Sequence, residues 1–241
     1  MSASHRMLRS GSFGGEGLVP AKAVFFVKRR PGIEVAALRE LFLSRELTAV
    51  RSLRPRRYVQ HHALPGGYRR GEPAFDLVVE LSLAADEPDL DVLGGVGACS
   101  AAAAAAVDRS RSLGMVVTDV LVKSGAPAAG GVTAFAPVCR RPDQERDEFF
   151  RYWRDVHGPT AAAIPQLVRY VQCHAVRPVR SAEGQVMEGC AVTWFDSTAA
   201  MREAAATPEY AATRADEPNF VAGVPPQVIT TEQARLGEEA V

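Results

Sequence analysis

Residues 58–63 read YVQHHA, and residues 170–175 read YVQCHA. Five of the six positions agree, and the two copies lie 112 residues apart (170 − 58). The repeat predicts a chain built from two structurally similar halves. Alternate residues of a strand share one face, so each copy places a Tyr, a Gln and a His on the same face. We expect these polar faces to point inward and line a cavity, and the opposite apolar faces to pack on helices.

The segments around the two copies predict the same order of elements, β-α-β-β-α-β, which is the ferredoxin-like arrangement. In the first half we expect strands at 24–27, 58–63, 75–83 and 116–122, with helices at 35–47 and 99–113. In the second half we expect strands at 132–138, 170–176, 189–195 and 228–231, with helices from 143 to about 156 and at 201–206. The predicted fold is α+β, with two tandem ferredoxin-like repeats forming an intramolecular α+β barrel.

This pattern also divides the chain into segments. A Ser- and Gly-rich N-terminal segment, 1–22, is expected to be disordered. The first half then spans 23–124, a Gly/Ala/Pro linker spans 125–131, the second half spans 132–232, and a tail spans 233–241. A fused pair of this kind is expected to be a monomer with an internal pseudo-dimer, or a homodimer.

Composition excludes several classes of partner. Lys plus Arg and Asp plus Glu both number 28 among 241 residues. A chain without net charge argues against nucleic acid as a partner, because phosphate binding needs a basic surface. No apolar run reaches the length of a membrane span, and no secretory signal opens the chain. The four cysteines have no metal-ligand spacing, which favours reduced thiols in a cytoplasmic protein without a metal site. The preference for Arg over Lys fits a bacterial coding bias.

The chemically richest stretch is residues 149–159, FFRYWRDVHGP. Its aromatic residues have the spacing of a buried helix face, and Asp143 is expected to cap this helix. Gly158 and Pro159 are expected to end it. His157 would then lie at a helix C-terminus, where the helix dipole favours its protonated form and burial opposes it. Such a group can exchange protons near neutral pH; the alternative is that it only caps the last carbonyls.

The same stretch, with PQL at 165–167, RYVQ at 169–172, WFDS at 194–197 and DEPNF at 216–220, resembles the EthD family within the dimeric α+β barrel superfamily. The resemblance covers residues 132–231 well and residues 24–124 loosely. In the first half Phe42 stands where Trp153 does, but Glu46 replaces His157. This difference favours one asymmetric pocket over two equivalent sites.

The resemblance implies a hydrophobic, aromatic or polyketide-like substrate and a cofactor-independent lyase, isomerase or cyclase. In this interpretation His157 or His174, with His62 as the pseudo-twin of His174, transfers a proton in the barrel cleft. Tyr152, Tyr170 or Tyr58 stabilises an enolate. Gln60 and Gln172 orient the substrate, and Trp153 and Trp194 form apolar walls. His61 is expected to face the helices with a structural role.

Three alternatives stay open. One is a monooxygenase, either cofactor-free or with a haem held by His62, His157 or His174. The second is a non-catalytic protein that binds a small hydrophobic molecule. The third, a metal site, has only Asp155 and Glu46 as nearby carboxylates. Fold resemblance alone does not choose among them.

Overall fold

The computed structural model describes residues 22–69, 71–83, 97–180, 184–223 and 226–237. The predicted N-terminal segment lies outside the described residues except for Lys22, which opens the first strand. The first half contains β1 (Lys22–Val27), α1 (Val35–Leu41), η1 (Phe42–Glu46), α2 (Leu47–Arg51), β2 (Arg57–Ala63), α3 (Pro65–Tyr68), β3 (Leu77–Ser82), α4 (Ala101–Ala106) and β4 (Leu113–Lys123).

The second half repeats this order after the linker. It contains β5 (Val132–Cys139), α5 (Arg146–Tyr152), η3 (Trp153–His157), α6 (Gly158–Ala162), β6 (Arg169–Arg180), β7 (Val186–Phe195), α7 (Thr198–Ala204), α8 (Pro208–Asp216), η4 (Glu217–Asn219) and β8 (Val228–Gly237). The last strand runs six residues past the predicted end at Thr231, into the segment expected to be a tail.

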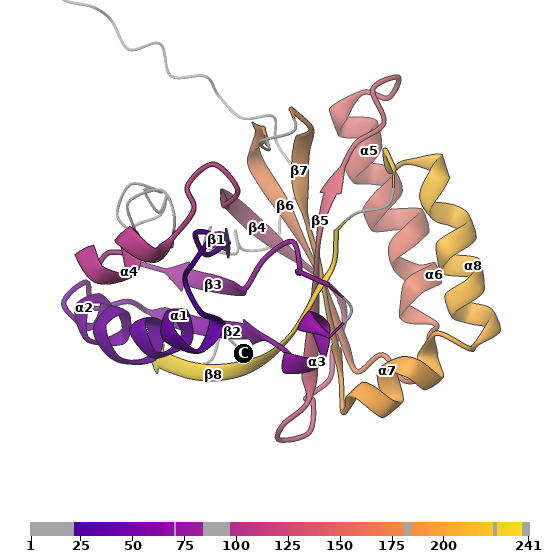
Figure 1. The fold of residues 1–241 in the computed structure, drawn as a ribbon. Helices are drawn as coiled ribbons and strands as arrows, with labels where there is room; N and C mark the ends of the chain where they lie inside the picture. Colours follow the sequence, from indigo (N-terminus) through magenta and orange to yellow (C-terminus); the bar gives the residue numbers. More distant parts are fainter. Residues whose placement is uncertain (1–21, 70, 84–96, 181–183, 224–225, 238–241) are drawn as a thin grey trace, which may run out of the picture.

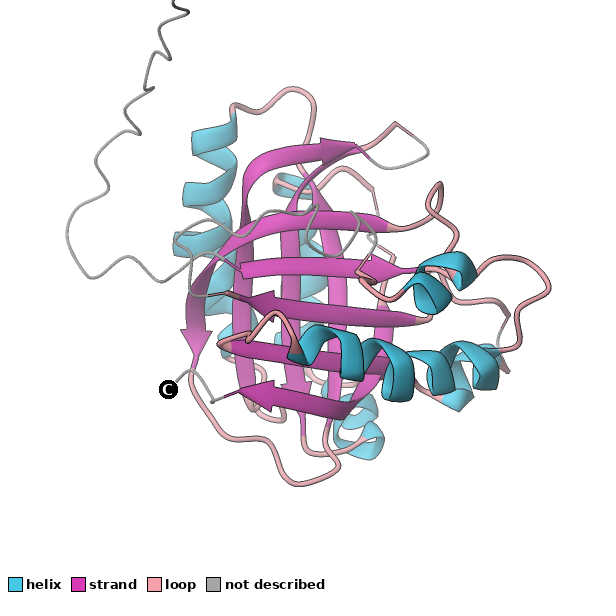
Figure 2. Cartoon of the chain, turned by 90° about the vertical axis from the view of Figure 1, so that its left-hand side faces the viewer, coloured by secondary structure: helices cyan, strands magenta, loops and turns pink. Residues whose placement is uncertain are grey.

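The eight strands close one barrel in the order β1-β3-β2-β8-β5-β7-β6-β4, and β4 pairs with β1 to complete it. Each half supplies four adjacent strands, and the halves join where β2 pairs with β8 and β4 pairs with β6. In Figure 2 the strands of the near sheet run across those of the far sheet. The predicted fold class, two ferredoxin-like repeats in one intramolecular barrel, is confirmed.

Helices cover the barrel on two opposite sides (Figure 1). Helices α1, α2 and α4 lie over the sheet of the first half, and α5 to α8 lie over the sheet of the second. The barrel interior is a separate apolar core, with Phe26, Met115 and Phe135 among its buried residues. The structure is therefore a layer of helices, a closed and largely filled barrel, and a second layer of helices.

The polar faces of the repeated strands point toward the helices, and the prediction that they point into the barrel is wrong. Tyr58 packs in the core beneath α1 and η1, and Tyr170 packs beneath α6. His62 and His174 therefore lie on opposite sides of the molecule, each under its own helices. The physical reason is that both faces of these strands are buried, so polarity alone did not reveal which face the helices cover.

His61 was expected to face the helices, and this too is wrong. Its ring lies 4.8 Å from that of Phe135 inside the barrel. Its Nε2 lies 2.8 Å from Oε1 of Glu80, and both side chains are almost fully buried. A carboxylate on the neighbouring strand thus gives the imidazole the partner that a buried polar group requires.

The repeated Tyr-x-Gln-x-His motif performs one structural task in both halves. Nε2 of Gln60 donates to the carbonyl of Phe42 at 2.8 Å, and Nε2 of Gln172 donates to the carbonyl of Trp153 at 2.6 Å. Each carbonyl opens a π-helical turn, η1 or η3. The same glutamines bond the neighbouring tyrosine and histidine of their strand. The motif therefore fastens the π-helical turn of each half to the sheet.

The prediction that Gly158 and Pro159 end the long helix of the second half is wrong. The helix passes through the π-helical turn η3 and continues to Ala162. Pro159 lies in the first turn of α6, where its missing N–H costs little. Asp143 does not cap this helix, because its carboxylate pairs with Arg141 and the N-cap residue is Glu145.

The Ala-rich helix is also shorter than predicted. Helix α4 covers six residues of the predicted 99–113. Val107 follows with an extended backbone and forms a β-bridge with Arg29. Tertiary pairing therefore overrides the high helix propensity of alanine here. Ser197 caps α7 by accepting from the N–H of Ala200.

Candidate functional site

A cavity of about 370 Å³ lies between the sheet of the second half and the helical layer formed by η3, α6, α7 and α8. This volume is in the range of small-molecule sites, about 300–1,000 Å³. Most of the wall is apolar and comes from both layers. Its apolar residues include Ala134, Ala136, Trp153, Ile164, Leu167, Phe195, Phe220 and Ile229. The cavity thus suits a hydrophobic molecule, and polar side chains in its wall, among them His157 and Tyr170, can orient that molecule.

His157 is the histidine that lines this cavity. The π-helical turn η3 places its side chain beneath Phe220, with ring centroids 4.6 Å apart. Nδ1 of His157 lies 2.9 Å from Oδ2 of Asp216, at the end of α8. A carboxylate facing Nδ1 holds the proton there, which leaves Nε2 unprotonated, with a lone pair that can accept a proton. Nε2 has no protein hydrogen-bond partner among the described residues.

Burial lowers the pKa of His157 below its usual value, although the nearby Asp216 carboxylate opposes the shift. The imidazole is therefore neutral at pH 7 and able to accept a proton. Burial also disfavours the charge on Asp216, but hydrogen bonds from Tyr152, Asn219 and His157 outweigh it and lower the pKa of Asp216. The pair is a neutral imidazole beside an ionised carboxylate.

Asp216 is itself held from three directions. Its Oδ1 accepts from the hydroxyl of Tyr152 at 2.6 Å and from Nδ2 of Asn219 at 3.0 Å. Its Oδ2 faces His157. The hydrogen bond to Asp216 raises the pKa of Tyr152, so this phenol stays protonated. Tyr152 does not line the cavity and instead positions the carboxylate.

Tyr170 is the second polar group that faces the ligand space. Its hydroxyl accepts from Nε1 of Trp153 at 3.0 Å and from Nε2 of Gln172 at 3.4 Å. Burial raises the pKa of Tyr170 above its usual value, although both donors oppose the shift. A neutral phenol whose oxygen already accepts two bonds still has its own O–H to donate. Because Tyr170 lines the cavity, this O–H is available to a ligand oxygen.

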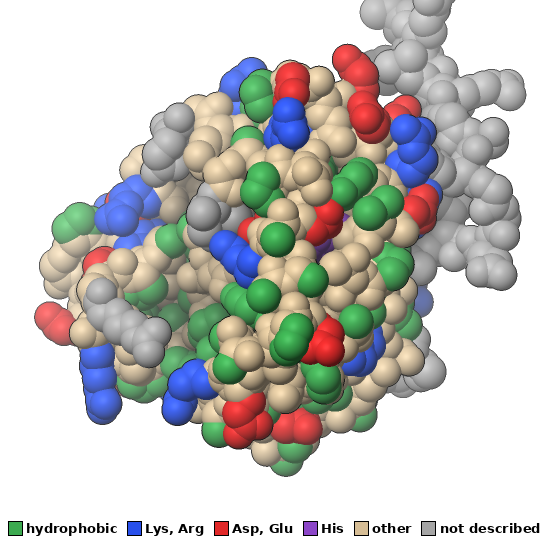
Figure 3. All heavy atoms as spheres, turned by 90° about the vertical axis from the view of Figure 1, so that its right-hand side faces the viewer, with side chains coloured by type: hydrophobic (Ala, Val, Ile, Leu, Met, Phe, Trp, Pro, Cys, Tyr) green, Lys and Arg blue, Asp and Glu red, His purple; other side chains and the backbone are tan. Residues whose placement is uncertain are grey.

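Charged side chains also border the cavity. Nη1 of Arg214 pairs with Oε1 of Glu217 at 2.6 Å, and Arg202 bonds Thr198. Burial raises the pKa of Glu217, and Arg214 opposes this shift. Figure 3 looks onto the face formed by α5 to α8, where acidic and basic side chains are interspersed. Among the described residues of this face, no single-sign patch of the kind that binds nucleic acid is seen.

Only three of the predicted site residues line this cavity: His157, Tyr170 and Trp153. The ring of His174 is stacked between Phe150 at 4.5 Å and Trp153 at 4.9 Å. Gln172 is fully buried beneath η3, where it holds the carbonyl of Trp153. The structure therefore brings His174 and Gln172 close to the site but behind its wall.

The other predicted residues lie elsewhere. Tyr58, Gln60 and His62 form the corresponding buried network of the first half. Trp194 lies at one end of the barrel, under the guanidinium of Arg169. None of these four lines the cavity.

The first half has a carboxylate where the second half has its histidine. Glu46 is fully buried and accepts from the backbone N–H groups of Cys99 and Ser100, both at 2.8 Å. Both of its oxygens therefore serve to anchor the start of α4. The two halves share the strand network but have diverged at the helix, so the candidate site is asymmetric.

Asp216 is the residue of the candidate site that the sequence did not reveal. It lies 59 residues from His157 in the chain. The segment DEPNF at 216–220 was part of the family resemblance, but no role could be assigned to its first residue. A conspicuous acidic residue before the last strand was the available signal, and only the fold shows which histidine it meets.

The buried histidines predict acid sensitivity. Burial lowers the pKa of His62 and of His174 to about 3, whereas an unfolded histidine titrates near 6.5. Below that pH the two histidines bind protons in the unfolded chain but not in the folded protein, so stability falls as pH falls. We expect a loss of about 2 kcal/mol for each of the two histidines between pH 7 and pH 5.

Urea unfolding at a series of pH values measures this effect. The double variant His62→Asn/His174→Asn should lose about 4 kcal/mol less than the parent over the same interval. If the free energy of unfolding fell with pH equally in the parent and the double variant, the folded protein would not hold the pKa of these two histidines below that of the unfolded chain.

One protein-family model matches part of the second half. The EthD domain model matches residues 141–223, a span that includes both His157 and Asp216. The second half is therefore similar to an EthD domain over these residues. No curated protein matches the chain.

Solved structures match the complete barrel. A proposed monooxygenase from Lactobacillus acidophilus NCFM is 9% identical, with a TM-score of 0.54 over 92% of this chain and 98% of that one. An anthrone oxidase-like protein is 12% identical, with a TM-score of 0.55 over 90% and 92%. A mutant chlorite dismutase from Candidatus Nitrospira defluvii is 9% identical, with a TM-score of 0.51 over 90% and 92%. At these identities the likeness establishes the fold.

The described residues contain no group of three or more His, Cys, Asp or Glu side chains arranged to hold a metal ion. None of their helices has both the length and the apolar character needed to cross a membrane.

Proposed function

We propose that the cavity of the second half is the active site of a cofactor-independent lyase, isomerase or cyclase acting on an aromatic or polyketide-like ketone. The observation that carries the proposal is the pair formed by His157 and Asp216, 2.9 Å apart, in an apolar cavity. A neutral imidazole oriented by a carboxylate is a general base. The apolar wall supports a hydrophobic substrate.

The reaction begins at a carbon next to the substrate carbonyl. Nε2 of His157 takes the proton from this carbon, and the C–H electron pair becomes the enolate. The O–H of Tyr170 donates to the enolate oxygen, where negative charge develops. Asp216 stabilises the imidazolium that forms. Return of the proton to another carbon gives an isomer, and its transfer to a departing hydroxyl gives a dehydrated product.

A monooxygenase is the second candidate, and the names of the structural neighbours favour it. A proposed monooxygenase and an anthrone oxidase-like protein are among them. The same removal of a proton by His157 would start that reaction, because an enolate or phenolate is the form that donates an electron to oxygen. Oxygen consumption with an anthrone would support this version, and product formation without oxygen would support the lyase version.

A haem-dependent version makes a separate demand on the residues. An axial ligand needs a free ring nitrogen facing open space. Of the three histidines considered, His157 alone lines the cavity, whereas Nε2 of His62 and of His174 bonds a glutamine. The carboxylate of Asp216, which contacts Nδ1 of His157, is the usual support of a ligating histidine. His157 would therefore hold the group, which would supply redox chemistry, and a Soret band in the purified protein is the test.

Deuterium exchange tests the proposed base directly. Anthrone in D₂O without oxygen is a suitable probe, because its methylene protons, across the central ring from the carbonyl, are acidic: the anion left by their removal delocalises through the fused rings onto the carbonyl oxygen. We expect the protein to accelerate exchange at this methylene and the His157→Gln variant to lose about 10²–10⁴-fold of that rate. Anthrone affinity should change much less than the rate.

His62→Gln is the matched control, because it alters the fully enclosed histidine of the first half. It should retain the exchange rate of the parent. Equal rates in the parent and the His157→Gln variant would contradict the assignment of the base. Binding of anthrone without any exchange would instead indicate a non-catalytic binding protein.

A further inference from the structure

A second cavity, of about 730 Å³, lies at one end of the barrel. All eight strands contribute to its wall, so it is the mouth of the barrel, one of the usual places for a ligand. It shares no lining residue with the cavity of the candidate active site. On β5 and β7, Thr133 and Trp194 line the mouth while their neighbours Ala134 and Thr193 line the other cavity. Strand alternation therefore keeps the two spaces on opposite faces of one sheet.

The linker between the halves forms one rim of this mouth. Residues 125–131 all line it. The backbone N–H of Ala128 donates to Oδ1 of Asp196 at 2.8 Å. A Cβ at Gly125 would lie 2.3 Å from the carbonyl oxygen of Val168, so glycine is needed for the close approach to β6. The rim is thus fastened to the ends of β6 and β7.

Most charges in the mouth are paired with one another. Nζ of Lys22, a nearly fully buried residue, lies 2.6 Å from Oε2 of Glu80 and 2.8 Å from Oδ2 of Asp119. Arg57 also contacts Glu80, at 3.3 Å. Arg235 pairs with Glu232 through Nε and Oε1, 2.9 Å apart. These contacts balance the three carboxylates of the wall.

Arg169 is the remaining cation of the wall and takes no part in these ion pairs. Its guanidinium lies 5.7 Å from the ring centroid of Trp194. Among the described residues it has no carboxylate partner. A guanidinium held over an indole in this way keeps its N–H fork, which can bind a carboxylate through two hydrogen bonds.

Asp119, which also lines the mouth, has an acceptor that is unused. Oδ1 of Asp119 is buried and has no hydrogen-bond partner, although Oδ2 pairs with Lys22. A buried carboxylate oxygen without a donor is costly. It therefore invites a hydroxyl or amine group from whatever occupies the space. The apolar surface between the two ends includes Trp194 and Val171.

We propose that the barrel mouth is a second small-molecule site, which binds an aromatic carboxylate carrying a hydrogen-bond donor at its other end. Arg169 binds the carboxylate, the face of the ligand lies against the apolar wall, and Oδ1 of Asp119 accepts from the donor. This ligand adds one negative charge, which matches the one unpaired cation. The site is independent of His157 and of the reaction proposed for the other cavity.

4-Hydroxybenzoate is the probe for this site. The protein has two tryptophans, so in a Trp153→Phe background the remaining fluorescence reports Trp194 in the barrel mouth. We expect saturable quenching by 4-hydroxybenzoate. In the same background, Arg169→Gln should weaken binding about 10- to 100-fold through loss of a charge-assisted pair. Arg169→Lys should fall between the two, because it keeps the charge and loses the fork.

Matched ligands and variants locate the contacts. Methyl 4-hydroxybenzoate, which lacks the negative charge, should bind the parent and Arg169→Gln equally weakly. Benzoate should bind less tightly than 4-hydroxybenzoate, because it lacks the donor for Asp119. Arg51→Gln, an exposed charge change on α2, and His157→Gln, in the other cavity, should both bind like the parent.

Three results would overturn the proposal. One is the absence of saturable quenching up to ~10 mM, a concentration above any affinity useful to a small ligand. Another is undiminished binding to Arg169→Gln. The third is weakening by His157→Gln, which would move the probe to the other cavity. Because the two cavities share no residue, failure here would leave the anthrone exchange experiment unaffected.

Discussion

Replacing Asp216 with asparagine is expected to slow anthrone deuterium exchange by about 10³–10⁴-fold while leaving the fold intact. Oδ1 of Asp216 receives two donors, Tyr152 and Asn219. An asparagine would keep its carbonyl oxygen there and turn its NH₂ group toward His157. The imidazole would then accept at Nδ1 and carry its proton on Nε2, the nitrogen that must act as the base. The variant thus loses activity because its imidazole is in the wrong tautomer, while the cavity keeps its shape.

The exchange rate and its pH profile together distinguish this mechanism from simple damage. In the parent the rate should rise through the lowered pKa of His157 and level off before pH 7. Asp216→Asn should lower the plateau, with anthrone affinity nearly unchanged. Tyr152→Phe removes one support of the carboxylate and should cost only about 10-fold, because Asn219 remains. An Asp216→Asn plateau close to that of the parent would refute the orienting role.

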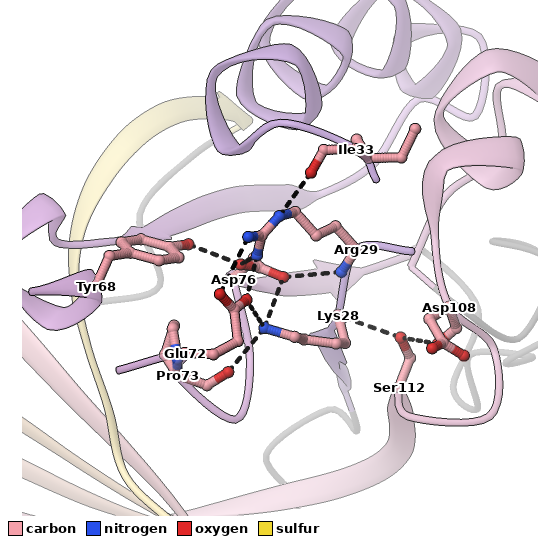
Figure 4. Close-up of polar contacts among 9 residues, drawn as sticks. All are labelled: Lys28, Arg29, Ile33, Tyr68, Glu72, Pro73, Asp76, Asp108 and Ser112. Atoms are coloured by element: carbon pink, nitrogen blue, oxygen red, sulfur yellow. Dashed lines mark hydrogen bonds and ion pairs between the residues drawn. The ribbon is translucent and has the colours of Figure 1, made fainter. Parts of the chain in front are cut away.

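Replacing Asp76 with alanine is expected to be strongly destabilising, with a loss of about 3–5 kcal/mol. Asp76 is 3% exposed and lies at the centre of the ion cluster in Figure 4. Its carboxylate accepts from the backbone N–H of Arg29 at 2.8 Å, from Nη1 of Arg29 at 2.6 Å and from the Tyr68 hydroxyl at 2.8 Å. Nζ of the buried Lys28 lies 3.3 Å away. Removal of the carboxylate leaves all of these donors short of an acceptor.

Glu72 provides the matched control, because it contacts the same two cations from the surface. Its side chain is 46% exposed, and its carboxylate pairs with Lys28 at 2.5 Å. Glu72→Ala should cost about 1 kcal/mol or less, since exposed ion pairs contribute little. Urea midpoints at pH 7 compare the two variants. Equal losses would show that the cluster is held by charge alone and that burial of Asp76 adds nothing.

The near-identity of residues 58–63 and 170–175 was sufficient to predict the two halves, the order of their elements and the closed barrel. Such a repeat leaves few alternatives, because two similar β-α-β-β-α-β units in one chain have complementary outer strands to pair. The sequence likewise pointed to His157 and to the glutamate that replaces it at position 46. Local spacing and composition carried all of these predictions.

The tertiary structure alone decided which side of each strand faces the helices, where the long helix of the second half ends, and what meets His157. Val59 and Gln60 are neighbours on β2, and both are fully buried, so alternation of polarity could not assign their faces. The π-helical turn η3 carries the helix through Gly158 and Pro159, where local residue preferences indicate an end. Asp216 reaches His157 across 59 residues of chain. Contacts at that separation depend on the packing of α8 against η3, which no local pattern of residues encodes.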